Sequence, residues 1–418
     1  MTPAARLQMA IDILETMEKS DQPADRLLKD WFRTRRFAGS KDRAAIAERV
    51  FAVQRNRAAL AWRMQSKTPR ALVIAAMLAD GEAPDTLFTG DGYGPPLLSD
   101  EERAAIAATP PPAPLHVQGA FPQFLEPELT QTFGERLLDE MTALNARAPI
   151  DLRVNTIRRE RGEVLAALIA QGFAAEPTPF APQGIRIASG EGMSALGRSA
   201  MFESGAFEFQ DEAAQIAAIL VRARPGMRIL DLTAGAGGKS LALSADMRNQ
   251  GEIVASDIRQ PALQELAVRA TRAGATNIKT HLLDERRPLD ETFDTVLLDA
   301  PCSGSGTWRR QPELRWRLTP QRLAELVPLQ DRLLAQAATH VKPGGRLVYA
   351  TCSILPRENE ARVATFLARN PAFKIVRADA AWRESAAAPP PPGLGEFFRA
   401  SPLTTGTDGF FAAVLQRD

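Results

Sequence analysis

Apolar positions in the C-terminal half of the chain fall into short runs that alternate with segments of helical periodicity. The run at Ile229, Leu230 and Leu232 predicts a buried central strand, and residues 240–247 return to a helix. Further strands are predicted at residues 252–256, 278–282, 295–298 and 346–350, and helices at residues 261–273, 320–341 and 357–369. This alternation predicts an α/β fold with a mostly parallel, doubly wound sheet covered on both faces. A last pair, residues 373–376 and 410–415, predicts an antiparallel hairpin at one edge.

The pattern before this core predicts three further segments. Residues 1–80 repeat apolar positions at helical intervals and predict a small helical domain. Residues 81–120 are rich in Pro, Gly and acidic side chains, and we interpret them as a linker around one short helix. Residues 121–205 predict a small α+β domain, and residues 206–418 form the predicted core domain. The strands of the α+β domain are expected at residues 152–155 and 184–188.

The composition is ordinary for a globular protein, with 418 residues, of which 45% are hydrophobic, and a net charge of +1. No run of about 18 apolar residues is present, and Asp12, Glu15 and Glu18 occupy the stretch where a signal peptide would be apolar. We therefore expect a cytoplasmic protein without a membrane partner, and a monomer. Two cysteines and three histidines are too few and too scattered for a zinc site or a disulfide framework, so no metal is expected.

Charge is unevenly distributed along the first 150 residues. Residues 1–80 hold 15 Lys and Arg against 9 Asp and Glu, whereas residues 81–150 hold 3 against 11. The basic part contains cations with interleaved aromatic side chains, namely Arg33, Arg35, Arg36, Lys41 and Arg43 with Trp31, Phe32 and Phe37. This mixture suits phosphate and base contacts in RNA. A solvated helix face with aromatic side chains in the core is the alternative.

The predicted central strand runs into a glycine-rich turn at residues 233–240. A P-loop would require Gly at Thr233, and a dinucleotide-binding turn would require Gly at Ser240. The remaining functional interpretation is a nucleoside cofactor without a pyrophosphate, held where bare backbone meets the first N–H groups of a helix. A simple strand-to-helix connector is the alternative.

Carboxylates follow the next two predicted strands, at the edge where a doubly wound sheet binds its ligands. Asp257 closes the second strand and could accept both ribose hydroxyls of a nucleoside, unless it only caps a helix. Asp284 follows the third strand and could hold the adenine, unless its charged surroundings are simply solvated.

Both cysteines follow strands that should lie beside each other, next to the central strand. Cys302 comes shortly after residues 295–298, and Cys352 comes directly after residues 346–350. A thiolate beside a cofactor indicates covalent catalysis, for example addition to carbon 6 of a pyrimidine so that carbon 5 can attack a methyl group. Lys239 and the N-terminus of the helix after Cys352 could lower the pKa of such a thiol from about 8.5. Small buried thiols that only pack at strand ends are the alternative.

Six stretches resemble the Sun/Fmu (RsmB-type) family of RNA cytosine-5 methyltransferases, which use S-adenosylmethionine. They are QDEAAQ (210–215), LDLTAGAGGKS (230–240), SDIRQPAL (256–263), LLDAPCSGSGTWRRQPELRWR (297–317), YATCSILPRENE (349–360) and TDGFFAAVL (407–415). The resemblance implies a Rossmann-like sheet of the class I methyltransferase kind and extends from about residue 152 to the C-terminus. The first 80 residues look only loosely like the NusB-like RNA-binding domain of some members.

The resemblance also implies roles for individual residues. Cys352 would attack carbon 6 of cytosine, Cys302 would assist breakdown of the adduct, and Asp299 with nearby Lys239 would bind the cytosine edge. The cofactor would be held by Thr233, Ala234, Gly235, Ala236, Gly237, Gly238, Lys239, Asp257, Asp284 and Asp299. Many relatives have Cys and Pro where this chain has Thr233 and Ala236, and neither change removes a needed functional group.

The family resemblance favours ribosomal RNA as the substrate, with transfer RNA as the main alternative. An RNA-binding assembly factor that has lost its chemistry is a hypothesis of another class, and the retained Cys302, Asp299, Lys239 and Cys352 oppose it. Four arginines after Cys302 predict a loop that grips the RNA backbone around an extruded base. They are Arg309, Arg310, Arg315 and Arg317. A solvated loop whose Trp308 packs on the core is the alternative.

Overall fold

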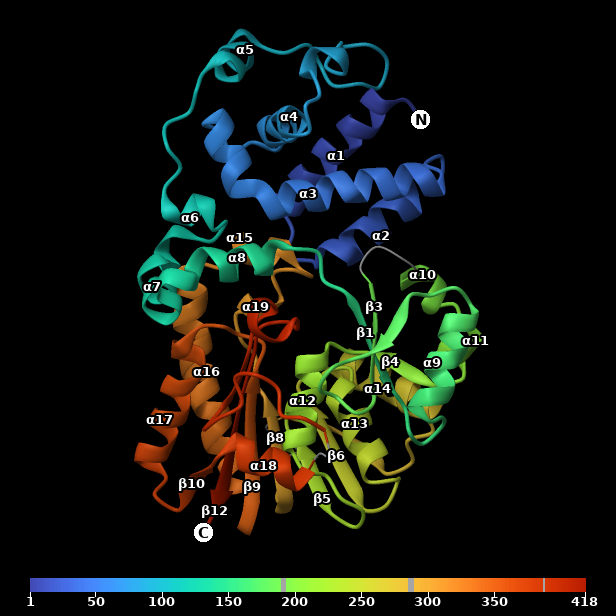
Figure 1. Ribbon diagram of the computed structural model, residues 1–418, viewed down its shortest axis with the longest axis vertical. Helices are drawn as coiled ribbons and strands as arrows, with labels where there is room; N and C mark the ends of the chain where they lie inside the picture. Colours follow the sequence, from blue (N-terminus) through green and yellow to red (C-terminus); the bar gives the residue numbers. More distant parts are fainter. Residues whose placement is uncertain (189–192, 285–288, 386–387) are drawn as a thin grey trace. The chain divides into compact units, whose positions relative to one another are not determined.

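A computed structural model describes residues 1–188, 193–284, 289–385 and 388–418, which divide into two compact units (Figure 1). The helical unit contains Met1–Asn145 and Trp308–Thr319, and the sheet unit contains Ala146–Thr307 and Pro320–Asp418. This division differs from the four predicted segments, because helices as far as Asn145 and one later segment pack together. Among the described residues, no helix is both long enough and apolar enough to cross a bilayer.

The helical unit consists of α-helices and short 3-10 turns. Its α-helices are α1 (Pro3–Glu18), α2 (Ala24–Thr34), α3 (Ser40–Met64), α4 (Pro69–Ala79), α5 (Asp100–Ala107), α6 (Leu115–Gln118), α7 (Glu126–Phe133), α8 (Leu137–Asn145) and α15 (Pro312–Arg317). The turns are η1 (Pro84–Thr86), η2 (Gln123–Leu125) and η3 (Gly134–Arg136). Hydroxyls mark two helix starts, since Thr2 accepts a hydrogen bond from the N–H of Ala5 and Thr68 accepts one from Ala71.

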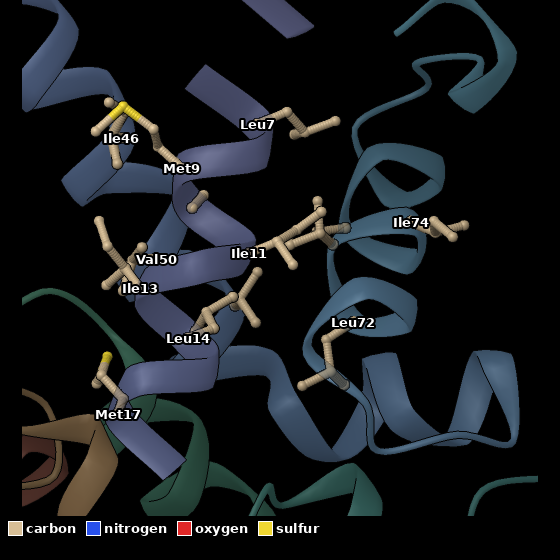
Figure 2. Packing of buried hydrophobic residues seen from close by; sticks show 14 of the residues in the cluster. Leu7, Met9, Ile11, Ile13, Leu14, Met17, Ile46, Val50, Leu72 and Ile74 are labelled. Atoms are coloured by element: carbon tan, nitrogen blue, oxygen red, sulfur yellow. The ribbon is translucent and has the colours of Figure 1, made fainter. Parts of the chain in front are cut away.

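The core of the helical unit lies between α1, α3 and α4. In Figure 2, Leu7, Ile11 and Leu14 of α1 lie on the side toward Leu72 of α4, and Ile46 and Val50 of α3 lie on the other side of α1. These side chains are at most 5% exposed, and full burial of each contributes about 1.5–3 kcal/mol. The helical periodicity of residues 1–80 therefore predicts this part of the fold correctly.

Two segments outside residues 1–80 complete the helical unit. The predicted linker contains α5 and α6, and it packs on α3, where the Arg63 guanidinium donates to the carbonyls of Ala105 and Ile106 at 2.9 and 2.7 Å. Helix α15 also joins α3, because the indole N–H of Trp316 donates to the carbonyl of Gln54 at 2.7 Å.

The smaller sheet of the sheet unit is antiparallel, with the strand order β2-β3-β1-β4. Its strands are β1 (Ile150–Val154), β2 (Ala175–Pro177), β3 (Gly184–Ile187) and β4 (Phe207–Phe209), and its helices are α9 (Arg161–Ala170), α10 (Met193–Leu196) and α11 (Ala200–Glu203). Strands β1 and β3 correspond to the two predicted strands. Strands β2 and β4 were not predicted, because three residues are too few to show an alternating pattern.

The larger sheet has the order β10-β12-β9-β8-β5-β6-β7, with β11 paired to β12 (Figure 1). Its strands are β5 (Arg228–Asp231), β6 (Glu252–Asp257), β7 (Ile278–Leu282), β8 (Phe293–Asp299), β9 (Val341–Thr351), β10 (Phe373–Val376), β11 (Phe398–Ala400) and β12 (Phe410–Arg417). The associated α-helices are α12 (Glu212–Leu220), α13 (Gly238–Asp246), α14 (Gln260–Ala273), α16 (Pro320–Thr339), α17 (Glu360–Arg369), α18 (Ala378–Ser385) and α19 (Pro402–Thr405). The remaining short turns are η4 (Ser305–Thr307) and η5 (Pro356–Glu358).

Successive residues of the central strands enter separate cores on the two faces of this sheet. In β9, Val348 packs with residues of α12, α13 and α18, whereas its neighbours Leu347 and Tyr349 pack with residues of α16 and α17. Strands covered on both faces are apolar throughout, which is why their pattern is readable in the sequence. The predicted doubly wound sheet is therefore confirmed.

The predicted edge hairpin is correct only in its pairing. Strands β10 and β12 are antiparallel, with Val376 opposite Val414, and β10 lies at the edge. However, β12 also pairs with β9 and therefore lies inside the sheet, and α18, β11 and α19 separate the two strands along the chain.

Candidate active site

The glycine-rich turn connects β5 to α13. Gly235 and Gly237 have φ angles of 56° and 81°, in the region that favours glycine. A Cβ atom on Gly237 would lie 2.0 Å from Cδ1 of Leu266, so the turn has no space for a side chain there. The N-terminus of α13 begins at Gly238, directly after this bare backbone.

The turn is tied to the neighbouring strand ends by hydrogen bonds. The N–H of Gly235 donates to Oδ2 of Asp257 at 2.9 Å, and the Thr233 hydroxyl donates to the carbonyl of Asp299 at 2.8 Å. These contacts bring together the turn, the end of β6 and the end of β8, as expected from parallel strands of one sheet.

Asp257 is buried and forms an ion pair with the side chain of Arg259. The backbone N–H and guanidinium of Arg259 donate to its carboxylate at 2.8–2.9 Å. Burial alone would raise the pKa of Asp257, but the hydrogen bonds and charge of Arg259 outweigh it and hold the pKa below its ordinary value. Asp284 is exposed and follows β7 at the same edge, since the N–H of Leu283 donates to the carbonyl of Asp257 at 3.0 Å.

Sequence reasoning missed Asp231, the last residue of β5. Its Oδ2 accepts a hydrogen bond from the Ser240 hydroxyl at 2.6 Å, and among the described residues its buried Oδ1 has no hydrogen-bond partner. Burial raises the pKa of Asp231 to about 6, despite the hydrogen bond from Ser240. A carboxylate directly before a glycine-rich turn was the sequence signal that could have identified it.

Two arginines outside the motif also hold the turn and were not predicted. Arg153 of β1 is buried and donates to the carbonyl of Gly238 at 2.6 Å, and Arg269 of α14 donates to the carbonyl of Ala236 at 2.7 Å. Both arginines therefore bind carbonyl oxygens of the turn and not its N–H groups.

The two cysteines are in direct contact. Cys302 lies in the loop after β8 and Cys352 follows β9, and these strands pair in parallel with Asp299 opposite Ala350. The sulfur atoms are 3.4 Å apart, well beyond a disulfide bond of about 2.05 Å, and both thiols are free and half-buried. The structure thus joins the two thiols that the sequence places after neighbouring strands.

The surroundings of Cys302 disfavour its ionised form. The hydrogen bond with Cys352, burial, and the negative charges of Cys352 and Glu358 together raise the pKa of Cys302 well above its ordinary value. Burial and the neighbouring charges thus favour the thiol form of Cys302, and either sulfur can donate in the contact between the two.

Lys239 provides a fixed positive charge near these sulfurs. Its Nζ donates to Oδ2 of Asp299 at 2.6 Å and lies 5.1 Å from the ring centroid of Phe410. Burial lowers the pKa of Lys239, but the charge and hydrogen bond of Asp299 outweigh it, with smaller contributions from Asp231 and Cys352, so that the pKa is raised.

A fully buried carboxylate, Glu358, connects the loops that carry the two cysteines. It accepts hydrogen bonds from the N–H and hydroxyl of Ser303 at 2.8 and 2.5 Å, from the hydroxyl of Ser353 at 2.5 Å and from the Gln330 amide at 3.0 Å. Ser303 and Ser353 directly follow Cys302 and Cys352. Glu358 is therefore a positioning residue for both sulfurs, although its motif had suggested no role for it.

We expect Glu358→Ala to lower the free energy of unfolding by about 3 kcal/mol, because it leaves several buried donors without an acceptor. Glu358→Gln should restore most of this loss, since the serine hydroxyls can turn to accept from the new amide. Glu360→Ala is the matched control in the same segment, with an expected loss below about 1 kcal/mol because Glu360 pairs with a half-exposed arginine. Urea unfolding of the three variants measures these differences, and equal stability of Glu358→Ala and the parent chain would contradict the assigned role.

The four arginines after Cys302 differ in how far they are buried. Arg315 is 0% exposed, and its guanidinium donates to Oδ1 of Asn145 and lies 4.9 Å from the centroid of the Trp308 ring. The prediction that Arg315 contacts RNA is therefore wrong, because the side chain belongs to the core of the helical unit. Arg309 is also buried, whereas Arg310 and Arg317 are half-buried.

The strand order, with an antiparallel β12 inserted beside β9, and the glycine-rich turn after β5 define a Rossmann-like sheet of the class I methyltransferase kind. Residues 218–416 match the model of the 16S rRNA methyltransferase RsmB/F family, and residues 121–193 match the ferredoxin-like domain of RsmF/B-like methyltransferases. Over these residues the chain is similar to the RsmB/F methyltransferase family, which confirms the resemblance inferred from the six motifs.

Individual proteins agree with this assignment. The chain is 35% identical over 298 residues to ribosomal RNA small subunit methyltransferase B of Klebsiella pneumoniae, a match that covers 70% of this chain and 65% of the relative. The chain thus spans slightly less than two thirds of that protein.

Two crystal structures share the fold. PH0851 covers 100% of this chain and 99% of its own, with 25% identity and a TM-score of 0.78. A methyltransferase homologue from Pyrococcus horikoshii covers 72% of this chain and 97% of its own, with 27% identity and a TM-score of 0.61.

Proposed function

We propose that this chain is an S-adenosylmethionine-dependent RNA (cytosine-5)-methyltransferase that acts on small-subunit ribosomal RNA through a covalent cysteine adduct. The observation that carries the proposal is the contact of two free thiols at 3.4 Å, at the same sheet edge as the glycine-rich turn and the Lys239–Asp299 pair. A methyltransferase that acted on a nitrogen or oxygen atom would have no need of this sulfur pair.

The residues of the turn fit the cofactor. Its glycines carry no side chain that would keep a ligand from the backbone, and the start of α13 favours a carboxylate. The carboxylate of Asp257 can accept ribose hydroxyls if the largely exposed Arg259 moves aside. The unpartnered Oδ1 of Asp231 could accept a hydrogen bond from the amino group of the cofactor. When bound, S-adenosylmethionine supplies an electrophilic methyl group.

Cys352 is the proposed nucleophile. Carbon 5 of cytosine is a poor nucleophile until a thiolate has added to carbon 6, and this addition gives carbon 5 the electron density it needs. The S–H of Cys302 and the charge of Lys239 both stabilise negative charge on the sulfur of Cys352.

Cys302 and the Lys239–Asp299 pair serve the remaining steps of the proposed reaction. After methylation, the proton on carbon 5 must leave before the bond between carbon 6 and Cys352 can break. That proton passes to water, the electrons of its bond form the double bond between carbons 5 and 6, and Cys352 leaves as a thiolate. Cys302 assists this elimination because its S–H can donate to the departing sulfur of Cys352. Asp299, held by Lys239 at 2.6 Å, accepts a hydrogen bond from the amino group of cytosine and favours protonation of the ring during attack.

Bisulfite sequencing of total RNA tests the reaction and the substrate together. Cells that lack the protein should lose one or more 5-methylcytosines in small-subunit ribosomal RNA, and the parent gene should restore them whereas a Cys352→Ala gene should not. A loss confined to transfer RNA would replace the proposed substrate. An unchanged 5-methylcytosine map would contradict the proposed reaction and leave an RNA-binding assembly factor as the interpretation.

A further inference from the structure

The structure divides the aromatic residues of the basic stretch into two groups. Phe32 is 7% exposed and packs in the core of the helical unit, with Trp31 against the same core. Phe37, between α2 and α3, is instead 75% exposed. Of the three aromatic side chains in the basic stretch, only that of Phe37 is exposed to water.

The cations around Phe37 are divided in the same way. Arg35 stacks on Trp31, with its guanidinium carbon 3.6 Å from a ring centroid, and Arg43 donates to the carbonyl of Ala38 at 2.7 Å. Arg35 and Arg43 therefore make contacts within the protein. The remaining three, Arg33, Arg36 and Lys41, are exposed.

Nearby carboxylates neutralise little of the positive charge of these exposed side chains. The side chain of Arg33 is 75% exposed, and its contact with Asp30 at 3.4 Å is a surface pair that contributes little. Asp42 is the only acidic residue among residues 33–43, and it is bound by Arg6 at 2.7 Å. The surface formed by Arg33, Arg36, Phe37 and Lys41 is therefore strongly basic, and we name it the α2–α3 corner.

We propose that the α2–α3 corner binds single-stranded RNA, with an unpaired base stacked on the ring of Phe37 and phosphates contacted by Arg33, Arg36 and Lys41. An exposed ring offers a face to any base, whereas bases stacked inside a duplex are not accessible to it. This inference rests on the proposed function, since it takes RNA as the substrate, and it adds a preference for an unpaired segment outside the sheet unit.

Binding of a fluorescein-labelled 12-nucleotide oligouridine to the full-length protein tests the corner by fluorescence anisotropy. Phe37→Ala should weaken binding by about 5- to 150-fold, and Phe37→Trp should retain the affinity because it retains a stacking face. Replacing Arg33, Arg36 and Lys41 together with glutamine should reduce the slope of log K against log salt by about 2. A 12-base-pair RNA duplex should show little response to Phe37→Ala.

Tyr93 provides a matched control within the helical unit. It is 89% exposed, but residues 81–102 around it contain six acidic residues and no Lys or Arg. Tyr93→Ala removes an equally exposed ring and should leave the affinity for oligouridine unchanged. Equal affinities of Phe37→Ala and the parent chain, or an equal loss with Tyr93→Ala, would overturn the proposal.

The corner and the proposed reaction can fail independently. If the corner is correct and the reaction is wrong, Phe37→Ala weakens oligouridine binding although bisulfite sequencing finds no lost 5-methylcytosine. If the reaction is correct and the corner is wrong, methylation depends on Cys352 whereas Phe37→Ala binds oligouridine as the parent chain does.

Discussion

Cys352→Ala should reduce methyl transfer to RNA by about 10⁴-fold or more while cofactor binding remains unchanged. The size of the loss follows from the role of the sulfur, because removal of a covalent nucleophile eliminates the pathway rather than one stabilising contact. Cofactor binding should persist, since the proposed cofactor contacts come from the turn after β5 and from Asp257, not from the end of β9.

Single-turnover transfer of a radiolabelled methyl group to RNA measures the chemical step, and equilibrium dialysis of the cofactor measures binding. Cys302→Ala is the matched control, because it removes a sulfur 3.4 Å away and leaves the proposed nucleophile in place. Unchanged turnover of Cys352→Ala would exclude Cys352 from the mechanism. A parallel loss of cofactor binding would indicate that the substitution had disturbed the sheet edge as a whole.

The second large effect is expected for Cys302→Ala, which should accumulate a covalent complex between the protein and RNA. Cys352 remains able to add to carbon 6, whereas the elimination that releases the product loses the side chain that assists it. Because the chain has two cysteines, Cys302→Ala leaves Cys352 as its only thiol.

A denaturing gel after incubation with RNA and S-adenosylmethionine should show the complex as a band of reduced mobility. The double variant Cys302→Ala/Cys352→Ala should show none, which distinguishes a bond to Cys352 from nonspecific cross-linking. If Cys302→Ala releases methylated RNA at the parent rate without a complex, Cys302 has no part in product release.

Much of the sheet and of the site could be predicted because their causes are local or repetitive. Strands β5, β8 and β9 are covered on both faces, so their residues are apolar almost throughout and stand out between amphipathic helices. Parallel strands end at one edge, so Cys302 and Cys352 could be placed together before any coordinate was known.

The remaining features depend on residues that are distant in the sequence. Segment Trp308–Thr319 lies between β8 and α16 along the chain, yet Arg315 packs against Asn145 in the helical unit, and no local pattern indicates such a contact. Glu358 and Arg153 look like ordinary charged residues in the sequence, and only the fold surrounds them with buried partners.

The sequence by itself determined the alternation of the main strands and helices of the larger sheet, the glycine-rich turn and the shared edge of the two thiols, because backbone sterics and burial on two faces leave local signatures. Only the tertiary structure decided which charged and aromatic side chains are buried. It placed Arg315 in a core, left Phe37 in water and joined Glu358 to both cysteine loops, because exposure depends on what the rest of the chain covers.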